Sequence, residues 1–283
     1  MHPYAIVTEA SCDLSPERFA SLQVLVVPVP LSINGKQYKG VSLEQFYTQL
    51  RAKAVIKTAT PSPEDFIHVA KPALQKGQDV LYVGLSTTLS GTFQSGRIAM
   101  EELKQRYPER QIISIDTLCG AMGQALLVEM AAKARADGKS LQETADLIEA
   151  NKTRVSHYFT LDQLEYLSRS GRLPSFQARL GDILNIKPIL KLDALGHFQI
   201  STKVRTYNKA INRLYEKVIE KAVELKNQVV YISHADVRAA AEGLADKIRL
   251  AGAREVVVTM LGPAIASHFG IGGIGVAFLS NTR

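Results

Sequence analysis

The chain has 283 residues, 46% of them hydrophobic, which is enough for one large α/β domain or two ordinary ones with a sizeable core. Lys and Arg number 34 against 27 Asp and Glu, so the formal net charge is +7. This excess favours an anionic ligand or partner, although a soluble surface with somewhat more Lys would give the same value. No run of Arg and Lys alternates with aromatic residues, so nucleic acid is not an expected partner.

Cysteine and histidine usage also restricts the class of protein. The two cysteines, Cys12 and Cys119, are too few for a disulfide framework and suit a reducing compartment. The six histidines include no pair at helical ligand spacing, so we predict neither a metal site nor a cofactor. The N-terminus lacks the pattern of a signal peptide, and no apolar run reaches the roughly 20 residues that a membrane-spanning helix needs. We therefore expect a cytoplasmic protein without stable membrane insertion.

Strands and helices alternate through the first half of the chain. Predicted strands cover 4–8, 79–84 and 111–116, with an extended segment at 24–33. Predicted helices start after the N-cap residues Ser15, Ser42, Ser62 and Ser140 and also cover 97–107 and 117–138. Apolar and small residues recur at helical steps in one stripe, formed by Phe93, Gly96, Met100, Leu103 and Tyr107. Such alternation predicts a parallel sheet covered by helices.

The pattern changes after about residue 155. The second half contains predicted strands at 156–161, 228–234, 254–261 and 273–279, an antiparallel ribbon at 187–206, and helices at 162–184 (with a break), 207–226, 236–252 and 263–270. We therefore predict an N-terminal α/β domain over residues 1–155 and a C-terminal mixed α/β domain over 156–283. The cleft between two such domains is the expected ligand site.

A run of hydroxyl side chains lies in "LSTTLSGTFQSG", residues 85–96, directly after a predicted buried strand. Parallel sheets bind ligands at the carboxyl ends of their strands, and three other loops of the first half, at 8–13, 57–65 and 116–120, are also rich in hydroxyls or begin a helix. Hydroxyls beside the backbone N–H groups of a helix start are well suited to an anionic oxygen. The sequence therefore predicts an anion-binding site here.

Sharper interpretations of the same residues remain open. "GTFQSGRI" resembles a phosphate-binding loop, but Arg97 and Ile98 replace its Lys and its Ser or Thr. A hydrolase or acyltransferase could use Ser90 or Cys119 as nucleophile, yet "GLSTT" lacks the last Gly of a nucleophile elbow, and no partner base is identifiable. The Gly-rich stretch after His268 would allow close approach to a ligand, although this His could simply cap a short helix.

Seven motifs in order resemble the DegV family of bacterial fatty-acid-binding proteins, which act as acyl-carrying subunits of fatty acid kinase. These motifs span nearly the whole chain and are "TEASCDL", "KTATPSPEDF", "LSGTFQSG", "IDTLCGAMGQ", "LEYLSRSGRLP", "LNIKPIL" and "GPAIASHFGIGGIGVAF". The resemblance implies a two-domain DegV-like fold in which one long-chain fatty acid lies in a tunnel between the domains. The chain would be a carrier without catalytic residues, and a separate kinase would phosphorylate the bound acid to an acyl phosphate.

The resemblance also implies roles for particular residues. Thr58 and Ser90 would hydrogen-bond the fatty-acid carboxylate, with His268 near the head group. Further head-group or portal neighbours would be Ser11, Thr60, Gly91, Thr92, Arg172 and Arg205, the two arginines lying near the portal or the kinase contact. Burial of each methylene contributes about 0.8 kcal/mol, so the tail would supply affinity while the hydroxyls fix the register.

The chain departs from the family pattern around the expected head group. The departures are Glu9 for Asp, Ala59 and Thr60 for Ser-Gln, Cys119 for Ser, and Phe269 and Ile271 for Thr and Pro. The last two predict a more apolar surrounding for His268.

Overall fold

The computed structural model describes residues 3–38, 42–163, 166 and 186–283. The chain forms two compact units, of which the first contains 1–30 and 59–153 and the second 31–58 and 154–283. This division differs from the predicted domains, 1–155 and 156–283, in the segment 31–58, which belongs to the second unit, and by two residues at the boundary, which lies after 153. Most of the helical segment expected at 162–184 lies outside the described residues.

The first unit is built on a parallel sheet, as predicted. Its four strands follow the order β2 (Val24–Val27), β1 (Tyr4–Glu9), β6 (Asp79–Gly84) and β7 (Ile112–Asp116). Every pair of neighbours is parallel. The two central strands are buried along their whole length, which explains their nearly continuous apolar sequence.

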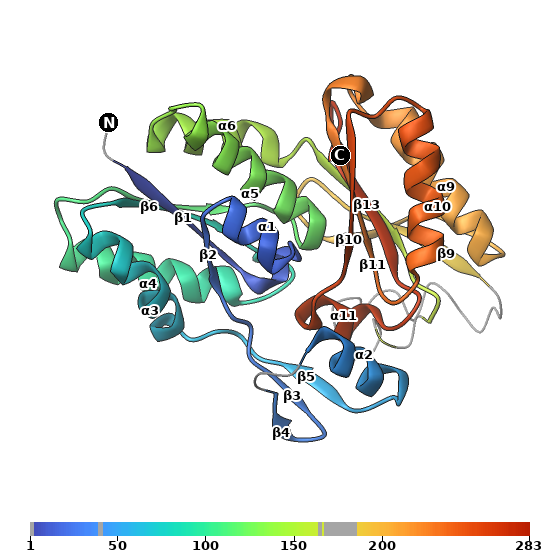
Figure 1. The fold of residues 1–283 in the computed structure, drawn as a ribbon, viewed down its shortest axis with the longest axis horizontal. Coiled ribbons are helices and arrows are strands. Elements are labelled where there is room, and N and C mark those ends of the chain that lie inside the picture. Colours follow the sequence, from blue (N-terminus) through green and yellow to red (C-terminus); the bar gives the residue numbers. More distant parts are fainter. Residues whose placement is uncertain (1–2, 39–41, 164–165, 167–185) are drawn as a thin grey trace. The chain divides into compact units, whose positions relative to one another are not determined.

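Helices cover both faces of this sheet. They are α1 (Pro16–Ser21), α3 (Pro63–Gln75), α4 (Thr92–Arg106), α5 (Ala121–Ala136) and α6 (Leu141–Lys152), with a short 3-10 turn η1 (Ala10–Cys12) after β1. Figure 1 shows α5 and α6 on one side of the sheet and α3 and α4 on the other. On the latter side Phe66, Tyr82, Phe93 and Met100 form the centre of an apolar cluster.

Local sequence signals account for most helix ends. Ser15, Ser62 and Ser140 each accept a backbone N–H as N-cap residues, as predicted. Helix α4 begins at Thr92, before the expected start at residue 97, and its N-cap Gly91 gives no side-chain bond. The predicted stripe on this helix is confirmed, because Phe93, Gly96, Met100 and Leu103 are buried and Tyr107 packs against the same cluster.

The second unit contains a larger, mixed sheet. Its strands follow the order β10 (Phe198–Val204), β9 (Lys187–Leu192), β8 (Val155–Thr160), β13 (Ile274–Leu279), β11 (Val229–His234) and β12 (Glu255–Met260). Only β11 and β12 pair in parallel; the other neighbours are antiparallel. The predicted ribbon of β9 and β10 is confirmed, with an irregular register between Ile200 and Thr202.

Two helices, α9 (Tyr207–Lys221) and α10 (Arg238–Leu250), cover one face of this sheet. Leu214, Leu244, Ile248 and Val276 belong to the core cluster that they form with the strands. Helix α9 ends before the predicted residue 226, because Ala222 is extended and forms a bridge with Ser280. A shorter helix, α11 (Pro263–Phe269), and a 3-10 turn, η2 (Leu225–Asn227), complete the described elements of this part.

The segment 31–58 adds a small antiparallel sheet and a helix to the second unit. It contains β3 (Leu31–Ile33), β4 (Lys36–Gln37), α2 (Leu43–Arg51) and β5 (Ile56–Thr58). The hydroxyl of Tyr47 donates to the carbonyl of Leu261 at 2.9 Å, and Arg51 forms an ion pair with Asp236. The extended run predicted at 24–33 is therefore divided between two sheets, with Pro28 and Pro30, which lack N–H donors, at the break.

Among the residues described, no helix is both long enough and apolar enough to cross a membrane.

Candidate functional site

The order of strands in the first unit marks one crevice. From β1 the chain continues to β2 on one side, whereas from β6 it continues to β7 on the other. Ligands of open parallel sheets bind at such a switch point, outside the carboxyl ends of the two strands. The segments that leave β1 and β6 here are η1, which contains Ser11, and the hydroxyl-rich loop 85–91, which we call the hydroxyl loop.

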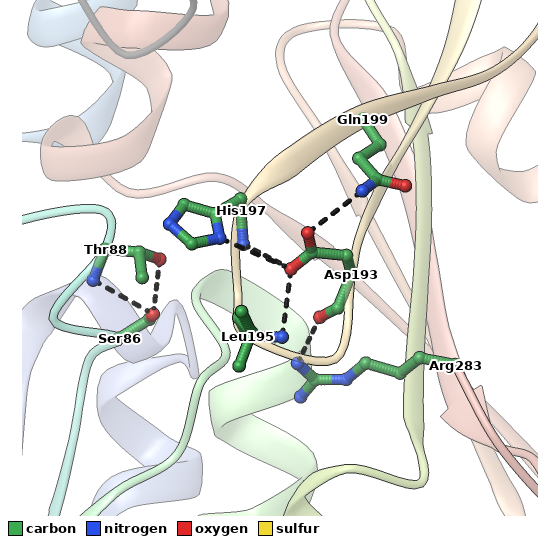
Figure 2. A network of polar contacts seen from close by, with 7 residues as sticks. All are labelled: Ser86, Thr88, Asp193, Leu195, His197, Gln199 and Arg283. Atoms are coloured by element: carbon green, nitrogen blue, oxygen red, sulfur yellow. Dashed lines mark hydrogen bonds and ion pairs between the residues drawn. The ribbon is translucent and has the colours of Figure 1, made fainter.

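The backbone N–H groups of residues 85–90 in the hydroxyl loop are bonded within the first unit. Their acceptors are Glu9 Oε2 for Leu85, the Cys119 carbonyl for Ser86, Asp116 Oδ2 for Thr87, Ser86 Oγ for Thr88, and the Ser86 carbonyl for both Leu89 and Ser90. Figure 2 shows Ser86 Oγ with Thr88, whose hydroxyl lies 2.8 Å away. The backbone N–H groups of residues 85–90 therefore already have acceptors within the protein, so the predicted anion site depends on the hydroxyls and on the start of α4.

Ser90 and Thr92 form a hydroxyl pair at the start of α4. Their Oγ atoms lie 2.8 Å apart, and Ser90 Oγ also accepts the N–H of Thr92 at 3.3 Å. One of the two hydroxyl protons is used in the bond between them, and the other can be donated to a ligand oxygen. Ser90 is partly exposed, whereas Thr92 is buried. The structure therefore shows Ser90 bonded to the first residue of α4 and still partly exposed.

Two other predicted head-group neighbours, Thr60 and Gly91, lie next to each other. A Cβ atom placed on Gly91 would be 3.8 Å from the hydroxyl oxygen of Thr60. Ser95 in the first turns of α4 donates to the carbonyl of Pro61 at 2.6 Å, which fixes this segment against the helix. The structure thus groups Thr60, Gly91, Ser90 and Thr92 within the first unit.

Ser11 and Glu9 belong to a buried polar network beneath the same strand ends. Glu9, the last residue of β1, is fully buried and accepts hydrogen bonds from the Tyr82 hydroxyl, the Leu85 N–H and the Gln124 side-chain amide. Ser11 is only 2% exposed and donates to Gln124 Oε1 at 3.4 Å. Burial raises the pKa of Glu9, and these hydrogen bonds oppose the shift. Sequence reasoning treated Glu9 as a departure from a motif and missed this network.

In the second unit, two predicted site residues meet directly. Thr58, the last residue of β5, and His268, near the end of α11, are 210 positions apart in the chain, yet Thr58 Oγ1 and His268 Nε2 lie 3.1 Å apart. Both side chains are partly buried. A hydroxyl and an imidazole at this distance form a polar pair that could donate to a carboxylate oxygen.

An aromatic cluster begins at the residue after His268. The ring of Phe269 stacks on Phe159 with centroids 5.0 Å apart, and Phe198 meets Phe159 edge-on at 5.4 Å. Leu161 and Leu190 are buried in the same cluster, with Ile200 packed against it. His268 of the polar pair is therefore followed in the chain by a residue of an aromatic and aliphatic cluster, and the more apolar surrounding expected for His268 stays a prediction.

The Gly-rich turn after His268 allows a close approach, but to side chains of the protein itself. Gly270 has a positive φ of 68°, and a Cβ at this position would collide with the ring of Tyr166. At Gly272 the Cβ would collide with Asp162, while the carbonyl of Gly272 accepts a 2.6 Å hydrogen bond from Tyr207. These glycines thus shape the turn that follows α11 and so help to place His268.

The remaining predicted residues have different settings. Arg205 is exposed between β10 and α9, and Arg172 lies outside the described residues. Cys119 is fully buried, and its sulfur lies 3.9 Å from the carbonyl of Lys152. Within the described residues, no group of three or more His, Cys, Asp or Glu side chains is arranged to hold a metal ion.

The turn that joins β9 and β10 is held by hydrogen bonds within the protein. Asp193 accepts the N–H groups of Leu195 and His197, both at 2.9 Å, and the side-chain amide of Gln199 (Figure 2). These bonds lower the pKa of Asp193 against the opposing effect of burial. Arg283 also donates to the Asp193 carbonyl, so the end of the chain is held at this turn. The network explains the hairpin and adds no candidate site.

Comparison with known proteins places this geometry in a family. The family model described as an uncharacterised protein of the DegV family matches residues 3–281. A DegV domain-containing protein of Clostridium perfringens is 32% identical over all of this chain and 99% of its own length, and one of Lactococcus lactis is 31% identical over 98% of each.

Solved structures agree with the sequence relatives. A DegV family protein of Thermus thermophilus, whose structure is described by its fatty acid binding, is 30% identical with a TM-score of 0.88, and the match covers 98% of this chain and 99% of that one. The fatty acid binding DegV family protein of Streptococcus agalactiae is 26% identical with a TM-score of 0.85 over the whole of both chains. The parallel sheet of the first unit and the mixed sheet of the second are thus those of a known fold, and the chain belongs to the DegV family.

Proposed function

We propose that this protein binds a long-chain fatty acid and carries it without transforming it. The observation that carries the proposal is the polar pair of Thr58 and His268, 3.1 Å apart, followed in the chain by Phe269 of the aromatic cluster around Phe159. A fatty acid has two parts that match these features, a carboxylate that accepts hydrogen bonds and an apolar chain. The relatives from Thermus thermophilus and Streptococcus agalactiae, which are described as binding fatty acids, support the same assignment.

The head group would be held by hydroxyls and an imidazole rather than by a salt bridge. Thr58 and His268 supply donors from the second unit, and the proposal that Ser90 contributes rests on the family resemblance and on its partly exposed hydroxyl. A desolvated carboxylate without such partners would cost several kcal/mol. The hydroxyls therefore select an acid, whereas the tail supplies most of the affinity, at about 0.8 kcal/mol for each buried methylene.

A separate kinase would act on the bound acid. In this proposal the chain presents the carboxylate in the bacterial cytoplasm, and the kinase transfers a phosphoryl group to it to form an acyl phosphate. The exposed Arg205, together with Arg172 and the net charge of +7, would attract the partner.

The structure offers no particular support for a nucleophilic enzyme. The sulfur of Cys119 is fully buried beside the carbonyl of Lys152, and Ser90 Oγ is bonded to the hydroxyl of Thr92 and the N–H of the same residue. A hydroxyl activated for attack needs a base within hydrogen-bond reach, and Thr92 is not one. Neither contact favours the hydrolase or acyltransferase alternative.

Extraction of the purified protein tests the proposal. We expect mass spectrometry of the organic extract to show a fatty acid of about fourteen to eighteen carbons near equimolar amount, because tails of that length gain enough from burial to outweigh ordering costs. The Thr58→Ala variant, purified in parallel, should carry less of it. An extract that contains only nucleotides or sugar phosphates would instead support a binder of another anionic small molecule and overturn the proposal.

A further inference from the structure

The polar network around Glu9 has no role in the head-group contacts described above, yet it joins the strand ends at the switch point. We infer that Glu9 is a positioning residue that holds the hydroxyl loop and thereby sets the preference of the protein for an acid head group. The inference rests on the proposed function, in which Ser90 on that loop contacts the ligand. Glu9 itself is fully buried and so would act through the loop rather than by contact.

Three elements meet at the Glu9 carboxyl group. Tyr82 from β6 donates to Oε1, while the N–H of Leu85 donates to Oε2 at 3.2 Å and Gln124 from α5 donates to the same oxygen at 2.6 Å. Leu85 is the first residue of the hydroxyl loop, so its bond to Glu9 fixes the direction in which the loop leaves β6. Gln124 also contacts Thr8 Oγ1 at 3.0 Å, which ties the network back to β1.

Two glycines leave space for the Tyr82 ring that this network needs. A Cβ atom on Gly84 or on Gly96 would lie 2.6 Å from atoms of the Tyr82 side chain, so both positions require glycine for the ring to occupy its place. The ring also stacks on Phe93 with centroids 5.5 Å apart. Because Tyr82 is fixed from three sides, its hydroxyl has one fixed direction, which is toward Glu9.

A second carboxylate holds the loop further along. Asp116, the last residue of β7, accepts the N–H of Thr87 at 3.3 Å and its hydroxyl at 2.6 Å. Glu9 and Asp116 therefore hold residues 85 and 87 from the ends of β1 and β7, the two strands on either side of β6, and Ser90 follows three residues after Thr87. Since the N–H groups from Leu85 to Ser90 are already bonded internally, the loop contributes hydroxyl directions, and these depend on how its backbone is held.

The test compares two tyrosines of the same unit. Tyr82→Phe removes the hydroxyl that contacts Glu9, and Tyr4→Phe removes a buried hydroxyl bonded to Thr144 Oγ1 at 2.7 Å near the amino end of β1. These two variants and a third, Glu9→Gln, are each delipidated and titrated with hexadecanoic acid and with 1-hexadecanol. We expect Tyr82→Phe and Glu9→Gln to lower the acid-over-alcohol ratio of affinities roughly threefold to tenfold, the effect of about one hydrogen bond, and Tyr4→Phe to leave it unchanged.

A double substitution separates positioning from plain loss of stability. If Glu9 acts through Ser90, then Tyr82→Phe should not lower the ratio further in a Ser90→Ala background, so the two effects are non-additive. A ratio in Tyr82→Phe and Glu9→Gln equal to that of Tyr4→Phe would overturn the inference and leave the proposed function intact. A wild-type protein that shows no preference for the acid would overturn the proposed function and the inference together.

Discussion

At the scale of single residues, Ser90 combines two contacts that have different energetic consequences. Its Oγ accepts the N–H of Thr92 at the start of α4, and it shares a second bond with the Thr92 hydroxyl. The first contact stabilises the helix start whether or not a ligand is bound. The second leaves one hydroxyl proton of the pair for a ligand oxygen, so a substitution should affect stability and binding by separable amounts.

Ser90→Ala should therefore cost about 1 kcal/mol of unfolding free energy, as expected for the loss of one hydrogen bond. It should also weaken binding of the acid roughly tenfold to hundredfold, because a hydrogen bond to a charged group contributes about 1.5–3 kcal/mol. Binding of the matching alcohol should change less. Urea unfolding and titration with both ligands measure the two effects. An unchanged preference for the acid, together with lower stability, would reduce Ser90 to a helix cap.

Thr58 offers a cleaner substitution, because it ends a short strand and caps no helix. Thr58→Ala removes the hydroxyl that lies 3.1 Å from His268 Nε2 and should weaken acid binding by a similar roughly tenfold to hundredfold factor. Thr58→Ser keeps the hydroxyl and should restore most of the affinity. Equal losses in Thr58→Ala and Thr58→Ser, measured by the same titration, would show that the methyl group matters instead of the hydroxyl.

Glu9 should make stability depend on pH in a defined direction. Burial raises its pKa above the usual 4.5, so the folded protein holds this proton more tightly than the unfolded chain. The resulting stabilisation is complete below about pH 4.5 and is lost as pH rises through the folded pKa. Burial also raises the pKa of the neighbouring Tyr82 and Cys12 well above their usual values, so these two groups stay neutral over that range.

The variant Glu9→Gln lacks this titration, which provides the measurement. The unfolding free energy of the wild type minus that of Glu9→Gln should decrease as pH rises from about 4.5, while other carboxyl groups cancel in the difference. Urea unfolding of both proteins at a series of pH values gives this quantity. A difference that grows with pH would mean that hydrogen bonds from Tyr82, Gln124 and Leu85 outweigh burial.

At the scale of elements, two helical glycines have opposite roles. Gly96 in α4 faces the Tyr82 ring, and Gly243 in α10 has no atom within 4 Å of the position of an added Cβ. Gly96→Ala should destabilise the protein by about 1–3 kcal/mol through overpacking, in spite of the better helix propensity of Ala. Gly243→Ala should stabilise it by about 0.5–1 kcal/mol. Thermal or urea unfolding would contradict this account if both variants shifted in the same direction.

Sequence patterns predict elements well where the signal is local. Each of the N-caps Ser15, Ser42, Ser62 and Ser140 is confirmed, and so is the parallel sheet of the first unit. Apolar periodicity does not say which sheet a strand will join, so the run at 24–33 looked continuous although its two ends pair in different sheets.

The candidate site shows the same limit. Residues near it were found because they lie in motifs, whereas Tyr82 and Gln124 lie 73 and 115 positions from Glu9, and each looks like an ordinary core or helix residue in its own segment. Gly84 and Gly96 both follow Tyr82 in the sequence and come close to its ring only in the fold, although a glycine inside a strand pattern, such as Gly84, suggests a close approach. Only the fold shows what that ring reaches.

At the scale of the whole molecule, charge bears on the partner. Arg172→Ala combined with Arg205→Ala should slow association with the kinase and weaken its dependence on salt, because surface charges act mainly on association rates. The bound lipid should stay unchanged. Arg106→Ala, which removes an exposed arginine paired with Glu102 in the first unit, is the matched control. Stopped-flow or surface association measurements decide it, and a loss of lipid without slower association would assign these arginines to the binding site.

Each unit combines two segments that are separated in the sequence, and this affects the order in which the protein can fold during synthesis. The first unit is complete once residue 153 has been synthesised, but the segment 31–58 belongs with a unit whose last strand ends at Leu279. Tyr47, fully buried in the finished protein, is therefore synthesised long before its hydrogen-bond partner Leu261. Thr58 is the last residue of this early segment, 31–58. The polar pair with His268 thus forms only when the last part of the chain has folded, so an incomplete chain would expose apolar surface while it still lacks its head-group pair.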